Sequence, residues 1–197
     1  MHINAADGQQ ALGAFEDYWQ ELLLTTKNAG GVQETACPVP QRSAFNPMKI
    51  HTCLPYIYVT EMLSDDMIEI RLSGSAIDDN AGQSLKGSNF LDICEPGERA
   101  IHVKICRLLI TWPCGIEMVR RTTRKDGRIH QYKSISYPFA DNVGVPRYIV
   151  GIADVAENVA VNLEFGHKEK IKTEIVHCNF VDIGAGVPPN PVLPKPE

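Results

Sequence analysis

The chain has 197 residues, a little more than one typical domain, so two complete domains would be cramped. Its 24 acidic and 19 basic residues give a formal net charge of −5, which argues against a protein that binds nucleic acid through a general affinity for phosphates. A hydrophobic share of 44% and a charged share of 22% exclude a wholly disordered or fibrous chain.

The N-terminal residues MHINAADGQQ lack a basic segment followed by an apolar run. No window approaches the ~18 consecutive apolar residues of a membrane-spanning helix, so we expect a cytoplasmic protein that does not enter a membrane. Six cysteines are present, and none forms a C-x-x-C pair of the kind found in zinc sites and redox turns. We therefore expect reduced thiols and no metal site.

The segment 1–37 predicts an amphipathic helix followed by a linker. Asp7 and Gln10 have the spacing of a capping box, and Gly30 ends the pattern. Four apolar residues recur at helical spacing: Leu12, Phe15, Trp19 and Leu22. Such a stripe is buried either on the body of the protein or against a second copy, and we expect a homodimer with these four residues as its interface.

The segment 38–155 predicts one α+β domain. Residues 56–60 and 67–73 have the composition and alternation of strands, and 74–94 is too interrupted for more than short helical turns. The spacing of Ile101, Ile105, Leu108 and Trp112 predicts a main helix that begins near Pro96. Three further strands are predicted over 116–124, 128–138 and 147–155.

Two segments follow this domain. Alternating residues predict an accessory β extension over 156–187, with a hairpin built from 159–165 and 171–183. The segment 188–197, PPNPVLPKPE, is rich in proline, and we expect a disordered tail that the fold does not need.

The stretch RRTTRKDGRIHQYKSISYPFADNVGVPRYIVGIADV resembles the final hairpin and closing strand of PAS sensor domains. Two upstream stretches, PQRSAFNPMKIHTCLPYIYV and RLSGSAIDDNAGQSLKGSNFLDI, resemble the first two strands and short helices of small single-domain bacterial PAS proteins. The resemblance implies a five-stranded antiparallel sheet, in the order 2-1-5-4-3, with helices on one face and a pocket between helix and sheet.

The resemblance also implies a function in signal sensing. We expect a stand-alone sensor or adaptor with no catalytic residues, which binds a small apolar ligand and a signalling protein such as a histidine kinase or its regulator. The expected ligand-binding residues come from the main helix and the strands that face it: Ile101, His102, Ile105, Leu108, Trp112, Met118 and Tyr132.

Cofactor binding is a separate hypothesis. His102 lies where some PAS domains that resemble this chain place an axial haem ligand, but its offset from the apolar stripe favours a flank or surface residue. Cys106 follows one turn after His102, but two ligands are too few for a metal site. Cys94 and Cys114 lack the Asn-Cys-Arg context of flavin-binding relatives, so we do not expect flavin.

Two further interpretations stay open. The basic run from Arg120 to Arg128 contains an Arg-x-x-x-Arg spacing that could bind phosphates, although an exposed charged hairpin is the simpler interpretation. A small cone-shaped α+β enzyme is the alternative function, in which Glu98, His102 and Tyr132 would transfer protons.

Overall fold

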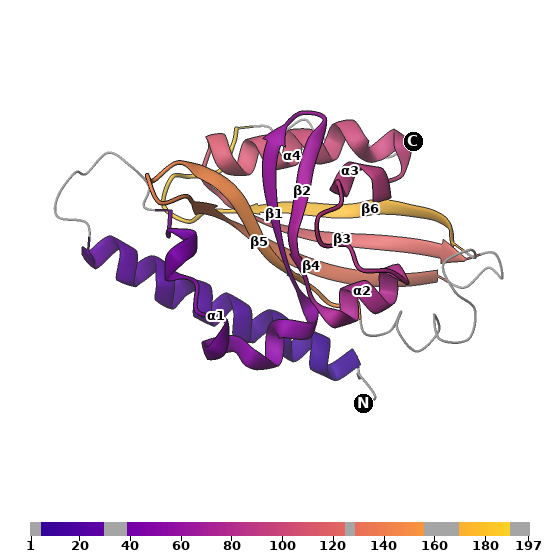
Figure 1. The fold of residues 1–197 in the computed structure, drawn as a ribbon, viewed down its shortest axis with the longest axis horizontal. Helices are drawn as coiled ribbons and strands as arrows, with labels where there is room; N and C mark the ends of the chain where they lie inside the picture. Colours follow the sequence, from indigo (N-terminus) through magenta and orange to yellow (C-terminus); the bar gives the residue numbers. More distant parts are fainter. Residues whose placement is uncertain (1–4, 30–38, 125–128, 156–169, 190–197) are drawn as a thin grey trace.

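A computed structural model describes residues 5–29, 39–124, 129–155 and 170–189. They form one antiparallel sheet with helices on both faces (Figure 1). The strands are β1 (Ile57–Ser64), β2 (Met67–Ser73), β3 (Gly115–Arg124), β4 (Ile129–Ala140), β5 (Pro146–Ala153) and β6 (Lys170–Val181). The helices are α1 (Ala5–Ala29), α2 (Ser75–Ala81), α3 (Phe90–Ile93) and α4 (Arg99–Thr111), with 3₁₀ segments η1 (Arg42–Ala44), η2 (Pro47–Tyr56) and η3 (Pro96–Glu98).

The strand order is β2-β1-β5-β4-β3-β6, with every neighbouring pair antiparallel. This confirms the predicted α+β class and the predicted order of five strands, and it adds a sixth. β6 comes from the segment expected to form an accessory hairpin, but it pairs with β3 from Gly115 to Arg124. An unpaired β3 would expose a long row of backbone donors and acceptors, which explains why the extension joins the main sheet. The first half of the expected hairpin lies outside the described residues.

The outer face of the sheet is packed tightly against α1. The indole of Trp19 stacks on the ring of Tyr137, with 4.5 Å between centroids and 3° between planes, and Phe15 lies 6.1 Å from the same ring. Leu12 is buried in the same cluster, and Leu22 is half-buried against it. The predicted dimer interface is therefore wrong, because three of its four residues are buried in the core of a single chain.

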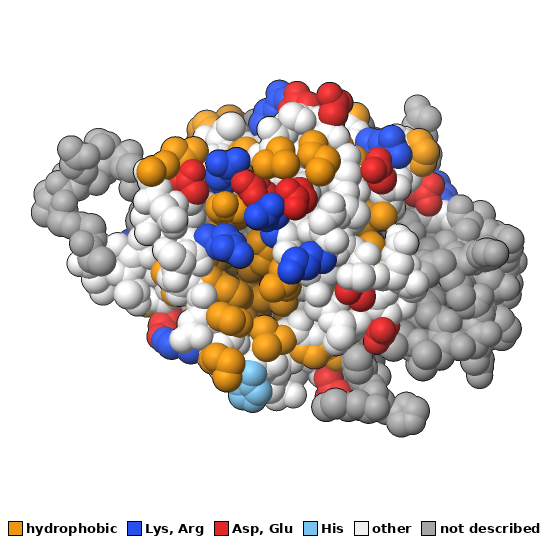
Figure 2. Space-filling view, viewed as in Figure 1, with side chains coloured by type: hydrophobic (Ala, Val, Ile, Leu, Met, Phe, Trp, Pro, Cys, Tyr) orange, Lys and Arg blue, Asp and Glu red, His pale blue; other side chains and the backbone are white. Residues whose placement is uncertain are grey.

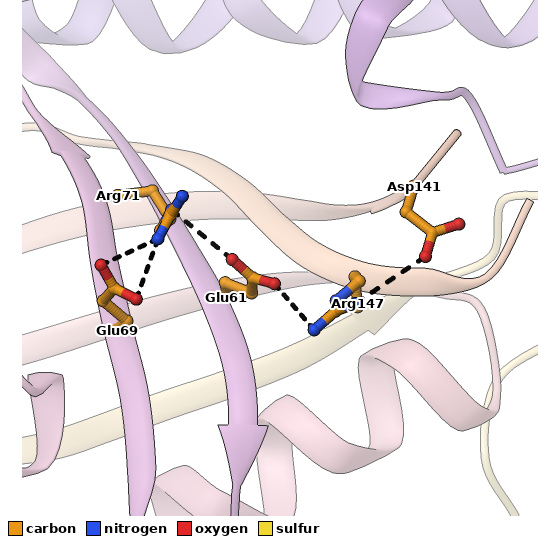
Figure 3. A network of polar contacts seen from close by, with 5 residues as sticks. All are labelled: Glu61, Glu69, Arg71, Asp141 and Arg147. Carbon is orange, nitrogen blue, oxygen red and sulfur yellow. Dashed lines mark hydrogen bonds and ion pairs between the residues drawn. The ribbon is translucent and has the colours of Figure 1, made fainter. Parts of the chain in front are cut away.

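A network of charged residues joins three strands on the outer face of the sheet (Figure 3). The carboxylate of Glu61 on β1, which is only 6% exposed, lies 2.9 Å from Arg147 on β5 and 3.5 Å from Arg71 on β2. Arg71 also donates to Glu69, and Arg147 lies 3.9 Å from Asp141. The two arginines compensate the buried charge of Glu61 and fix the order β2-β1-β5 at this end of the sheet.

The connecting segments differ from the sequence-based expectation at two places. The sequence predicts no helix between Gly30 and the first strand, but η1 and η2 lie there, and the side chain of Asn46 accepts a hydrogen bond from the backbone of Met48. In the expected tail, Pro188 is buried. The predicted linker at 30–37 and the predicted disordered residues 190–197 lie outside the described residues.

Candidate functional site

A cavity of about 550 Å³ lies between the inner face of the sheet and the helices α2, α3 and α4. Its size is within the range of small-molecule sites, about 300–1,000 Å³. Most of the lining is apolar and comes from Ile70, Ile77, Leu85, Phe90, Ile93, Ile105, Leu109, Ile116, Met118 and Ile149. The polar part of the lining includes Tyr58, Thr60, Glu98, His102, Arg120, Tyr132 and Ser136. The cavity therefore offers a hydrophobic volume with polar groups that could orient a ligand.

Four of the seven residues predicted to bind a ligand line this cavity: His102, Ile105, Met118 and Tyr132. Three do not, which corrects that prediction for Ile101, Leu108 and Trp112. Ile101 is buried elsewhere in the core, and Leu108 is half-buried. Trp112 lies beyond the end of α4, is 42% exposed, and donates from its indole N–H to the carbonyl of Ala185.

The reason for this error is the rotation of α4. The inner face of the helix carries His102, Ile105, Cys106 and Leu109, so the cavity-facing stripe is displaced from the one expected. His102 is 3% exposed and not at the surface, which corrects the expectation of a flank position. Because the polar residue His102 lies at the centre of the buried stripe, the spacing of apolar residues alone predicts the wrong orientation of the helix.

His102 lies between the carboxylate of Glu98 and the guanidinium of Arg120. Its Nε2 is 3.7 Å from Oε2 of Glu98, and its Nδ1 is 3.5 Å from a terminal guanidinium nitrogen of Arg120. Because Arg120 can only donate, Nδ1 is the acceptor, and the proton of the neutral ring is on Nε2 facing Glu98. Burial, reinforced by Arg120, lowers the pKa of His102 even though Glu98 acts in the opposite direction. The imidazole is therefore neutral at physiological pH.

Glu98 is positioned by a bulge in β6. Val119 of β3 pairs with His177, and the next residue, Arg120, pairs with Ile175, so Val176 is the extra residue on β6. The backbone N–H of Ile175 donates to Oε1 of Glu98 at 2.8 Å. Burial acts to raise the pKa of Glu98, but the contact with His102 and this backbone hydrogen bond outweigh it, and the pKa is lowered. The carboxylate is thus held ionised at the start of α4.

Arg120 belongs to this site, although the sequence placed it only in a basic run. Along β3, Ile116, Met118 and Arg120 face the cavity, whereas Arg121 faces the other way and pairs with Glu174 on β6. Arg120 stands opposite Tyr132 in the β3–β4 register. The expectation of an exposed charged hairpin is therefore wrong for Arg120, and Arg121 on the opposite face is half-buried, with 40% of its side chain exposed. The side chain of Arg124 and the residues 125–128 lie outside the description.

The wall of the cavity opposite α4 is shaped by a glycine. A Cβ on Gly151 of β5 would lie 2.5 Å from the ring of Tyr58 and 2.7 Å from Oγ of Ser136, so a larger residue would displace both. Without it, Tyr58 lies across β5, and its hydroxyl is 2.5 Å from the hydroxyl of Ser136. These two hydroxyls form a second polar position, beside the group around Arg120.

The cavity contains two cysteine thiols, one buried (Cys106) and one half-buried (Cys94). Cys94 and Cys106 line it, and burial is the largest of the effects that raise the pKa of each thiol to about 12. Among the described residues, no disulfide involves Cys53, Cys94, Cys106, Cys114 or Cys178. Thiols with such pKa values are poor nucleophiles and poor metal ligands at neutral pH. Among the described residues, no group of three or more His, Cys, Asp or Glu side chains could hold a metal ion.

The residues around His102 do not fit an axial haem ligand. The acceptor nitrogen of the neutral ring faces Arg120, so iron could bind it only by displacing the guanidinium and placing one cation beside another. A photoactive flavin has no matching sequence either, because none of the six cysteines lies between an asparagine and an arginine. We therefore derive no chemistry through either group.

The chain is similar to one protein family and to several solved structures. The PAS domain family matches residues 8–154, which include α1. A light-state structure of the LOV domain of the blue-light photoreceptor Aureochrome1 is 20% identical, with 59% of this chain and 96% of that chain covered and a TM-score of 0.38. The photo-excited blue-light photoreceptor Vivid is 18% identical, with 68% and 92% covered and a TM-score of 0.39.

An RNA-binding Light-Oxygen-Voltage receptor is 19% identical, with 71% of this chain and 43% of that chain covered and a TM-score of 0.39. No curated protein matches the sequence. None of the helices in the described ranges is long and apolar enough to cross a membrane. The family match extends over most of the chain and includes five of the six strands and the helices that enclose the cavity, so the chain belongs to the PAS domain family.

Proposed function

We propose that this chain is a signal-sensing module that binds a small molecule in the cavity between its sheet and α4, and that has no catalytic output of its own. The observation that carries the proposal is the contrast between the two faces of one sheet. The outer face is filled by stacked aromatic rings, whereas the inner face encloses about 550 Å³ with polar groups placed inside it. A hollow of this size in an otherwise well-packed domain favours ligand binding.

A bound molecule could be sensed through α4. Both ends of this helix are attached to the segment that begins with β6, through the hydrogen bond from Ile175 to Glu98 and the hydrogen bond from Trp112 to Ala185. A ligand that favours one position of α4 would therefore favour one arrangement of β6 and of the residues after it. A change inside the cavity would therefore be transmitted through α4 to the surface of the protein.

The output is then a change in contacts with a partner. We propose a cytoplasmic signalling protein, such as a histidine kinase or its regulator, and a homodimer whose interface is not the buried stripe of α1. Figure 2 shows hydrophobic side chains gathered near the middle of the face drawn, with Lys and Arg side chains beside them. Such a surface is compatible with a protein contact. The net charge of −5 argues against nucleic acid as the partner.

Mass spectrometry under non-denaturing conditions tests the ligand. Wild-type protein purified without refolding should retain a small molecule that is released on denaturation. The matched control is Ala81→Phe, which places a ring into the cavity from the end of α2 and should remove the extra mass. If the wild type and Ala81→Phe both have the mass of the bare chain, and added small molecules do not bind, the protein is a plain adaptor and not a sensor.

The geometry also favours a second candidate, a proton-transferring enzyme, because Glu98, His102 and Tyr132 line one cavity and two of them are in contact. Its test is turnover of a ligand identified in the cavity. Chemical conversion that is lost in His102→Ala would replace the sensing function by catalysis. A visible absorbance band in the purified protein would instead support a haem or flavin sensor.

A further inference from the structure

The strongest unexplained feature of the cavity is the guanidinium of Arg120. Arginine carries five N–H donors and stays charged at every physiological pH. It lies within hydrogen-bond distance of the ring nitrogen of His102, and Tyr132 lies opposite it in the β3–β4 register; both of these are neutral groups. Its Nε is fully buried and has no hydrogen-bond partner. Arg120 as a whole is half-buried, and a buried, unused donor on its charged group is costly unless a further acceptor compensates it.

The surrounding residues do not supply this acceptor. Among the residues that the structure describes, no carboxylate forms an ion pair with Arg120. The carboxylate of Glu98 lies on the other side of His102, but its two oxygens are directed at the backbone of Ile175 and at His102. His102 thus separates the acid from the base. The guanidinium retains donors for a group that is not part of the protein.

We propose that the cavity binds a mainly apolar molecule carrying one carboxylate group, and that Arg120 binds this carboxylate. The inference rests on the proposed function and specifies its ligand. The planar fork of arginine matches a carboxylate with two parallel hydrogen bonds. The remaining lining, from Ile70 and Leu85 to Met118 and Ile149, suits a hydrocarbon chain or ring.

The charge of the cavity selects one negative charge over two. Glu95 and Glu98 line the same cavity as Arg120, so a doubly charged phosphate would be repelled by two carboxylates and attracted by one guanidinium. A monocarboxylate adds one negative charge beside the positive charge of Arg120. The Tyr58–Ser136 pair offers a second polar position for a hydroxyl or carbonyl elsewhere on the ligand.

Matched pairs of probes test the inference by calorimetric titration. Each pair has the same skeleton with an acid or an alcohol at the end: decanoate and 1-decanol, and 4-phenylbutyrate and 4-phenylbutanol. In the wild type we expect at least one acid to bind about tenfold more tightly than its alcohol, the difference expected for one charged hydrogen bond. Arg120→Met should remove the preference by weakening the acid and not the alcohol.

Two controls isolate the role of the cavity arginine. Arg121→Met removes a positive charge from the neighbouring position on β3 but from the opposite face, and it should keep the preference for the acid. Arg120→Gln keeps a polar planar side chain without the charge, so it covers the case in which Arg120→Met fails to fold, and it should also lose the preference. Circular dichroism verifies the fold of each variant.

The outcomes separate this inference from the proposed function. Equal binding of acid and alcohol in the wild type, or a preference that survives in Arg120→Met, overturns the role of Arg120 as a carboxylate anchor but leaves a ligand-binding cavity. Tighter binding of decyl phosphate than of decanoate overturns the choice of a single charge. If no probe binds and the purified protein retains no small molecule, the inference and the sensing function both fail.

Discussion

The two faces of the sheet differ in how completely they are packed. On the outer face, α1 fills the space with the rings of Phe15, Trp19 and Tyr137, and the larger side chains there are fully buried. On the inner face, α4 and the short helices stand away from the sheet and leave a cavity of about 550 Å³. The comparison indicates that α1 provides stability, and that the inner face gives up packing for a binding site.

The largest effect is expected for Trp19→Ala on the filled face. This change removes a side chain that is fully buried and stacked on Tyr137. It should lower the free energy of unfolding by about 3–5 kcal/mol, measured by urea denaturation. Leu24→Ala is the control on the same helix, because Leu24 is 60% exposed and should change stability by less than about 0.5 kcal/mol. Equal effects of the two substitutions would show that α1 does not form part of the core.

A second prediction compares one substitution on both faces. Ala11 on α1 is 2% exposed within the filled core, so Ala11→Phe should cost about 1–3 kcal/mol through overpacking. Ala81 lines the cavity, so Ala81→Phe should find space and stay within about 0.5 kcal/mol of the wild type. Urea denaturation measures both. A loss of stability in Ala81→Phe as large as that in Ala11→Phe would mean that the inner face is not hollow.

The sequence allowed much of the fold to be predicted, because alternation, turn residues and order along the chain are local features. The five strands of the PAS arrangement and the main helix were expected near their observed positions. The placement of β6 beside β3, the burial of Leu12 and Trp19 within one chain, and the rotation of α4 all depend on partners distant in sequence. Local patterns carry no information about such partners.

The candidate site was predictable only in part for the same reason. The resemblance to PAS domains implied a pocket between the helix and the sheet, and Ile105 and Met118 were among the residues expected to line it. The basic run by itself did not distinguish Arg120 from Arg121, and the structure places only Arg120 inside the cavity. The one available signal was the alternation of Ile116, Met118 and Arg120, which places all three on one face.

A smaller effect is expected from pH, through His102. An unfolded chain takes up a proton on this histidine near pH 6.5, whereas the folded protein does so only at lower pH, because the pKa of His102 is lowered by burial and by Arg120. The unfolded state therefore binds more protons as the pH falls, and the free energy of unfolding should decrease between about pH 7 and pH 5. Urea denaturation across this range should show a smaller decrease in His102→Gln.

The control for this prediction is His51→Gln, because His51 is exposed on η2. This variant should follow the wild-type dependence on pH. If His102→Gln also follows it, His102 does not titrate differently in the folded and unfolded states, and the buried contact with Arg120 is not maintained in solution.

The most direct test of the account is to locate a bound molecule by isoleucine-methyl NMR, with decanoate and 1-decanol titrated separately. Ile105, Ile116 and Ile149 report on the hollow face, and Ile57, Ile135 and Ile152 report on the filled face. The account predicts saturable shift changes at the first three methyl groups and little change at the second three. Shift changes centred on the filled face, or no change at any of the six with either probe, would contradict a ligand site between the sheet and α4.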